Sequence, residues 1–212
     1  MTHTSLSDNP SRQLQVRDFY LGRQPVLDRD QALFGYELLF RQGPGEPGTT
    51  GVGAGMPSEL AASATVIAHA AQLGLDRVIG DALGFLRTDA AVLDSDIFAF
   101  LPRDKVVLEL TDSLPATPAL LARIGELRTH GFRFALAGVV TESEAVQALL
   151  PLVEFIKLDV ADMPLSALIH LAPRLRAQGK KLIADNVDTH DTYQSCLTWA
   201  WITSRAIILP GR

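Results

Sequence analysis

Strand-like and helix-like patterns of apolar residues alternate along most of this chain. Two segments, 19–28 ("FYLGRQPVLD") and 33–41 ("LFGYELLFR"), are separated by a short polar turn, which predicts a β-hairpin. From residue 57 the apolar spacing becomes helical in "PSELAASATVIAHAAQLGL", and strand and helix patterns then alternate to the end. This order is typical of a parallel sheet covered by helices.

The elements expected after this first helix can be given by residue range. Strands are expected at 83–87, 105–110, 132–139, 154–160, 180–187 and, with a less regular pattern, 199–209. Helices are expected at 114–130, 141–150, 163–178 and 189–197. Gly131 and Gly179 follow two of these helices, at the position where left-handed backbone commonly ends a helix.

The strand count favours an α/β barrel. Counted from the second hairpin strand, seven strands are expected to be parallel, one fewer than in a closed (β/α)₈ barrel. We therefore predict a TIM-like barrel with an N-terminal β-hairpin and a shortened C-terminus. A doubly wound open sheet is the alternative, but no Gly-rich phosphate-binding pattern follows the first strand.

Composition narrows the class of protein. The 212 residues are 47% hydrophobic with a formal net charge of −5, which permits a large core and argues against a partner that is a nucleic-acid polymer. The single cysteine excludes an intrachain disulfide, and no apolar run is long enough to span a membrane. We expect a cytoplasmic domain over 16–212, a disordered polar tail over 1–15 and a mobile Gly-rich loop over 42–56.

Charged residues inside apolar strands suggest a functional site. Glu37, Glu109 and Lys157 each interrupt such a strand, and a buried charge is costly unless it pairs with another charge or a ligand. In (β/α)₈ barrels the functional groups gather at the C-terminal ends of the strands. Other polar residues before helices, namely Asp112, Thr141 and Thr189, are expected to act as helix caps.

Four segments carry a resemblance to a known family: "RQPVLDRDQALFGYELLFR", "VVLELTDS", "EFIKLDV" and "LIADNVDT". Together they resemble the EAL domain of cyclic di-GMP phosphodiesterases, and the opening segment is most similar to the EAL domain joined to an HDOD domain in bacterial signalling proteins. The similarity extends over roughly 19–210, nearly the whole predicted domain.

The resemblance implies a role for several residues. Glu37 would be a divalent-metal ligand, Glu109 a second acidic ligand, and Lys157 the lysine that helps to position the attacking water. Asp185 falls in the family's late acidic motif. Residues that would line a nucleotide pocket are Leu39, Arg41, Arg87 and Asp188, with Arg41 as a phosphate contact.

The sequence also departs from the family pattern. The asparagine on the family's second barrel strand corresponds to Arg87, the Asp-Asp pair to Ala137-Gly138, and a late glutamine to Thr203. The "AEGVE" motif becomes "ADNVD", which shortens the side chain at Asp185. Two divalent cations bridged by carboxylates need more oxygen ligands than remain, so we expect no metal and vestigial ligands at Glu37, Glu109 and Asp185.

A specific hypothesis concerns the positive charge that a metal ion would otherwise supply beside Glu37 and Glu109. Arg87 would pair with Glu37 or Glu109 and take the electrostatic role of a metal; the alternative is an arginine exposed at a strand end.

The functional expectation is a degenerate EAL domain that acts as a regulatory protein-interaction module. The alternatives are a metal-independent receptor for cyclic di-GMP and a weak cyclic di-GMP phosphodiesterase that uses Mg²⁺ or Mn²⁺. The expected partner is another protein or a C-terminal HDOD-type domain, and the sequence leaves a homodimer open.

Overall fold

A computed structural model describes residues 19–42, 74–95, 99, 101–187, 189–197 and 202–204. The predicted tail over 1–15, most of the loop over 42–56 and the helix expected from residue 57 lie outside these residues. The elements, in chain order, are β1 (Phe19–Asp28), β2 (Leu33–Gln42), α2 (Leu75–Ile79), β3 (Leu83–Arg87), α3 (Ala90–Asp94), β4 (Val106–Thr111), α4 (Pro118–Thr129), β5 (Arg133–Val139), α5 (Glu144–Leu149), the 3₁₀-helix η1 (Leu150–Leu152), β6 (Phe155–Asp159), α6 (Leu165–Ala177), β7 (Lys181–Asp185), α7 (His190–Cys196) and β8 (Ile202–Ser204).

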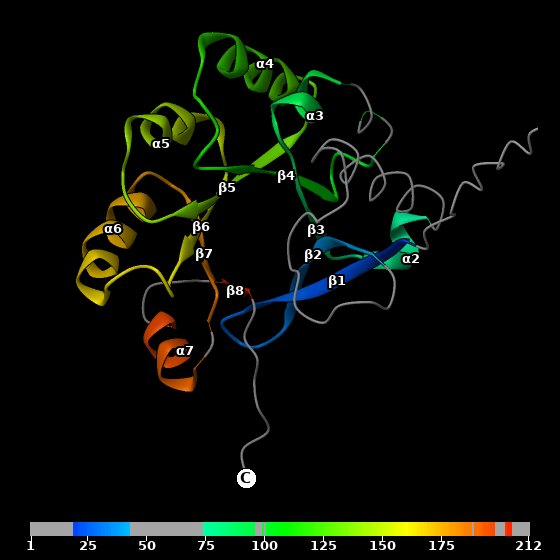
Figure 1. Ribbon diagram of the computed structural model, residues 1–212. Helices are drawn as coiled ribbons and strands as arrows, with labels where there is room; N and C mark the ends of the chain where they lie inside the picture. The colour runs from blue at the N-terminus through cyan, green and yellow to red at the C-terminus, as the bar shows by residue number, and fades with distance from the viewer. Residues whose placement is uncertain are drawn as a thin grey trace, which may run out of the picture.

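The strands form a closed barrel in the order β1 to β8, with helices on its outer side (Figure 1). Strands β2 to β8 run parallel, which confirms the seven parallel strands expected from the sequence. The eighth place is taken by β1, which pairs antiparallel with both β2 and β8. From the sequence, we expect seven parallel strands in an incomplete barrel, with the first hairpin strand outside it. In the structure that strand, β1, is the eighth strand of the barrel and closes it.

The hairpin turn is built by Asp28. Its Oδ1 atom accepts hydrogen bonds from the backbone N–H groups of Asp30 and Ala32, each at 2.9 Å. Gln31 completes the turn with a left-handed backbone, φ 63°. These contacts fix the pairing that sets Glu37 opposite Gln24 in β1.

The helices begin later than their apolar pattern suggested. Thr117 and Ser143 cap α4 and α5, where their side chains accept hydrogen bonds from Leu120 and Val146 N–H, each at 3.2 Å. The predicted caps Asp112 and Thr141 were therefore wrong, because each lies in a connecting turn before the first helical residue. The cap at Thr189 of α7 is confirmed.

Side chains alternate between two apolar clusters. Outward-facing residues of the strands pack beneath the helices, as Leu108, Leu136 and Leu158 do. Inward-facing residues fill one end of the barrel with a second cluster, in which the Phe85 and Phe155 rings meet edge to face at 5.4 Å. This alternation is the period of two expected for β-strands, and it leaves the other end of the interior to polar side chains.

Two glycines end helices as predicted. Gly131 after α4 and Gly179 after α6 have φ of 91° and 77°. Among the described residues, no helix combines the length and the apolar character needed to cross a membrane.

Candidate functional site

Glu37, Glu109 and Lys157 lie at the same level inside the barrel. They belong to β2, β4 and β6, and alternate strands of such barrels contribute side chains to the same interior layer. All three are buried, although each interrupts an otherwise apolar strand. Buried charges of this kind are expected to pair with one another or with a ligand.

Lys157 is the centre of the cluster. Its Nζ atom donates hydrogen bonds to Glu37 Oε1 and, at 3.1 Å, to Glu109 Oε2. Asp185 Oδ2 lies 3.6 Å from the same nitrogen. The side chain of Lys157 is only 2% exposed, so one ammonium group faces three carboxylates with little access to water. We call these four residues the Lys157 cluster.

The Lys157 cluster changes the proton affinities of its members. Burial lowers the pKa of Lys157, but the negative charges of Glu109, Glu37 and Asp185 outweigh it, so the pKa is raised. Burial also raises the pKa of Glu109, and the nearby Glu37 adds to the increase, while Lys157 opposes it. The pKa of Lys157 is therefore raised by the surrounding carboxylates, whereas the pKa of Glu109 is raised mainly by burial.

Asn186 holds the outer edge of the cluster. Its backbone N–H donates to Asp185 Oδ1 at 2.9 Å, and its side-chain Nδ2 donates to Asp159 Oδ2 at 2.7 Å. The residue has a left-handed backbone, φ 57°, which asparagine tolerates better than most residues. In the sequence, Asn186 stands out only as a change of motif, and nothing in the pattern predicts that it positions two carboxylates.

The Ala137-Gly138 pair brings no oxygen from its side chains. Ala137 is 2% exposed and follows Ala135 on the interior face of β5. Gly138 has φ 75°, and a Cβ atom there would lie 3.3 Å from Asp112 Oδ1. A larger residue at position 138 would therefore be both strained and close to a carboxylate.

Arg87 is not the central cation of the cluster. It is the last residue of β3, opposite Glu109 in the parallel register, and it is exposed. Its positive charge helps to lower the pKa of Glu109, but by less than the charge of Lys157 does. The cation between Glu37 and Glu109 is Lys157, because its side chain extends across the interior from β6 and contacts both carboxylates.

Of the other residues predicted to line a nucleotide pocket, the structure describes Leu39 and Arg41. Leu39 is half-buried in β2 opposite Gly22, and Arg41 lies in the same strand opposite Tyr20. Asp188 lies outside the described residues. Thr203 lies in β8, where it pairs with Ala184.

The donor atoms that the described residues place around Lys157 do not fit a pair of divalent cations. Such a pair requires bridging carboxylates and about six oxygen ligands for each ion. Three carboxylates here share the ammonium of Lys157, and Ala137 and Gly138 supply no side-chain oxygen. Within the part of the chain that the structure describes, no group of three or more His, Cys, Asp or Glu residues is arranged to hold a metal ion.

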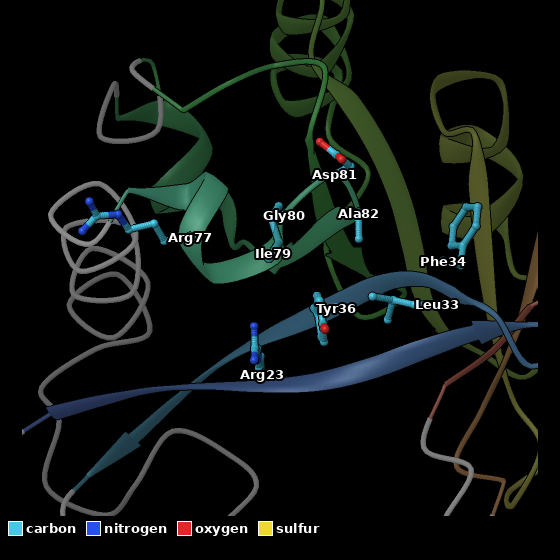
Figure 2. Close-up of a pocket in the computed structure, with 9 residues that line it drawn as sticks. All are labelled: Arg23, Leu33, Phe34, Tyr36, Arg77, Ile79, Gly80, Asp81 and Ala82. Atoms are coloured by element: carbon cyan, nitrogen blue, oxygen red, sulfur yellow. The ribbon is translucent and has the colours of Figure 1, made fainter.

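A cavity of about 600 Å³ lies away from this cluster, between the hairpin and the turn that leads into β3 (Figure 2). Two of the charged groups around it have partners in the chain. Arg23 lies over the Tyr36 ring at 4.9 Å and donates to the Val78 carbonyl, while Asp81 lies 3.8 Å from Lys105. The described residues that line this cavity include none of the predicted site residues.

Comparisons with known proteins point to one family. A scan against protein-family models gave no match. The cyclic di-GMP phosphodiesterase CdgJ of Vibrio cholerae serotype O1 is 28% identical over 176 residues, which cover 82% of this chain and 40% of that protein. The chain therefore spans less than half the length of this curated relative.

Solved EAL structures share the fold. The Bacillus subtilis YkuI protein, solved with cyclic di-GMP and calcium, superposes with a TM-score of 0.69 at 21% identity, over 88% of this chain and 53% of that one. The PaMucR phosphodiesterase, solved with cyclic di-GMP, gives a TM-score of 0.67 at 18% identity, over 88% of each chain.

Proposed function

We propose that this chain, an EAL-family domain related to cyclic di-GMP signalling, is a catalytically silent member that acts through contacts with another protein. The family assignment rests on the barrel and on the similarity to a curated cyclic di-GMP phosphodiesterase. The loss of catalysis and the regulatory role are our proposal, and the Lys157 cluster carries it.

The central observation is that Lys157 Nζ contacts Glu37, Glu109 and Asp185 together. These are the residues that the family resemblance identified as vestigial metal ligands. Their oxygens are already engaged by a buried ammonium whose raised pKa keeps it charged. A divalent cation would have to compete with this internal cation for the same oxygens.

The missing oxygens add to this argument. Phosphodiester hydrolysis by the two-metal route needs a metal-bound hydroxide and a second cation to offset the charge of the leaving group. Ala137 and Gly138 have no side-chain oxygen that could bind a metal ion. Asp185, which is one methylene shorter than the glutamate of the family motif, lies 3.6 Å from Lys157 Nζ through its Oδ2 atom. We therefore propose that Mg²⁺ and Mn²⁺ are not cofactors of this domain.

A metal-independent receptor for cyclic di-GMP is the second candidate. The observation in its favour is the exposed Arg87 at the end of β3, where a phosphate group could reach it. Against it, a dianion entering this mouth meets Glu109, Asp159 and Asp185, and only part of their charge is balanced by Lys157. Weak phosphodiesterase activity is the third candidate.

One set of measurements separates the three candidates. Cyclic di-GMP is titrated into the chain by calorimetry, with EDTA and with Mg²⁺ or Mn²⁺, and the products are followed by chromatography. We expect neither binding nor turnover. Micromolar binding in EDTA would establish the receptor, and metal-dependent formation of the linear dinucleotide would overturn the proposal.

The partner is proposed to be a separate protein or a C-terminal HDOD-type domain, in the cytoplasm. Crosslinking the chain to such a domain, supplied as a separate polypeptide, tests this directly. Sedimentation at several concentrations decides whether the domain also forms a homodimer.

A further inference from the structure

A cavity of about 720 Å³ lies beside the first residues of β5, β6 and β7, at the end of the barrel away from the Lys157 cluster. It is bordered by the turn at Gly131 between α4 and β5, by Pro151 to Glu154 before β6, and by Lys180 before β7. A smaller cavity of about 350 Å³ adjoins it and shares Pro151 and Lys180. Hollows of this size accommodate small ligands.

Part of the charge around this cavity is neutralised within the chain. Arg133 forms a two-pronged ion pair with Glu154, with Nε and Nη2 at 2.9 and 3.0 Å from the carboxylate oxygens. Lys181 Nζ lies 2.8 Å from the same carboxylate. The single carboxylate of Glu154 is therefore already shared by two cations.

Two other cations at this cavity are held by backbone carbonyls. Arg128 Nη1 donates to the Pro151 carbonyl at 3.1 Å, and Lys180 Nζ donates to the Val153 carbonyl at 2.8 Å. Among the residues described by the structure, no carboxylate lies within ion-pair distance of either side chain. Their two carbonyl partners belong to the same short segment, so the two positive charges are held beside the same cavity.

The positive charges of Arg128 and Lys180 repel each other. Burial lowers the pKa of Lys180, and the positive charge of Arg128 lowers it further. The chain as a whole has a net charge of −5, so this positive region stands out against an acidic protein. An anion bound between the two groups would relieve their repulsion and gain two charge-assisted hydrogen bonds.

We propose that this cavity binds the phosphate group of a small molecule, held by Arg128 and Lys180. The planar guanidinium group can contact two phosphate oxygens, and the ammonium group adds a compact charge on the other side. The site is at the opposite end of the barrel from the Lys157 cluster. It is therefore independent of the function proposed for that cluster.

The test uses inorganic pyrophosphate as the probe and NMR amide spectra of the ¹⁵N-labelled chain. We expect saturable shifts at Gly131 and Gly179, which border the cavity, and no shifts at Gly138 and Asn186 near the Lys157 cluster. The R128Q/K180Q variant should weaken the affinity at least tenfold. The control R29Q/R77Q removes the same amount of charge at the hairpin turn and α2, and it should retain the wild-type affinity.

Two outcomes would overturn the site. One is the absence of saturable shifts at Gly131 and Gly179 with millimolar pyrophosphate at low salt. The other is an equal loss of affinity in both double variants, which would indicate a general charge effect. Because the shifts are measured on the wild-type chain, the first outcome is informative even if R128Q/K180Q folds poorly.

Discussion

Lys157 Nζ lies 3.1 Å from Glu109 Oε2, and both residues are buried in the barrel interior 48 positions apart in the sequence. This contact, together with those to Glu37 and Asp185, places a protein cation among the carboxylates that the family resemblance assigns to metal binding. Its consequences for stability and for metal affinity can be measured on single variants.

Replacing Lys157 should strongly destabilise the domain. K157M leaves three carboxylates around an apolar side chain, and an uncompensated buried charge of this kind costs about 3–5 kcal/mol. Urea unfolding followed by circular dichroism measures the loss. The control K181M removes an exposed lysine that bonds Glu154, and it should cost no more than about 1 kcal/mol.

The coupling between the two residues can be isolated in the same assay. E109Q/K157M should be less destabilised than the sum of the single variants, because it removes one of the unpaired carboxylates. Additive losses would show that the 3.1 Å contact contributes no interaction energy.

The raised pKa of Glu109 should produce a characteristic pH dependence. As the pH rises above the ordinary carboxyl value of about 4.3, the unfolded chain releases this proton while the folded chain still retains it. The folded state then binds more protons, so its stability falls as the pH rises through the raised pKa. E109Q should lack this decrease, whereas E126Q, at an exposed site on α4, should retain it.

The measurement is the urea midpoint at increasing pH from about pH 4, because the decrease begins near the ordinary carboxyl pKa. An identical slope in wild type and E109Q would show that Glu109 titrates in the folded state as it does in the unfolded state.

Restoring a carboxylate at Ala137 should create a dependence on metal ions. A137D adds a negative charge to an interior that already has an excess of carboxylate, and we expect a loss of about 2–4 kcal/mol in EDTA. Millimolar Mn²⁺ should recover part of this loss, because a cation would offset the added charge. A137N has a similar shape without the charge and should not respond to Mn²⁺.

The wild-type chain is the reference for this experiment. If Mn²⁺ raised the unfolding temperature of the wild type as much as that of A137D, the ammonium of Lys157 would not be occupying the cation position.

Two glycines should respond to alanine in opposite directions. A Cβ atom at Gly35 in β2 would lie 2.8 Å from the Leu83 carbonyl oxygen, so G35A should cost about 1–3 kcal/mol through displacement of backbone. Gly125 lies within α4, and a Cβ atom there would meet no described atom within 4 Å outside its chain neighbours and the adjacent backbone of its own helix. G125A should therefore gain about 0.5–1 kcal/mol from helix propensity. Thermal unfolding of the two variants side by side provides the comparison, and a loss in both would contradict it.

The local pattern of the sequence was sufficient for the strands and most helices. Apolar spacing predicted the β-strands and the four later helices, because burial of one face imposes a period that is visible in any single segment. Gly131 and Gly179 were also predictable, since a left-handed residue after a helix favours glycine. The five-residue helices α2 and α3 were missed because one turn is too short to show a period.

The sequence by itself determined that Glu37, Glu109 and Lys157 must find partners, because a charge inside an apolar strand is costly in any fold. Only the tertiary structure decided which partners. Barrel closure by the antiparallel β1 and the layering of alternate strands bring Lys157, rather than Arg87, between the two glutamates. That choice depends on the direction in which each side chain points across the interior, which no single segment of sequence specifies.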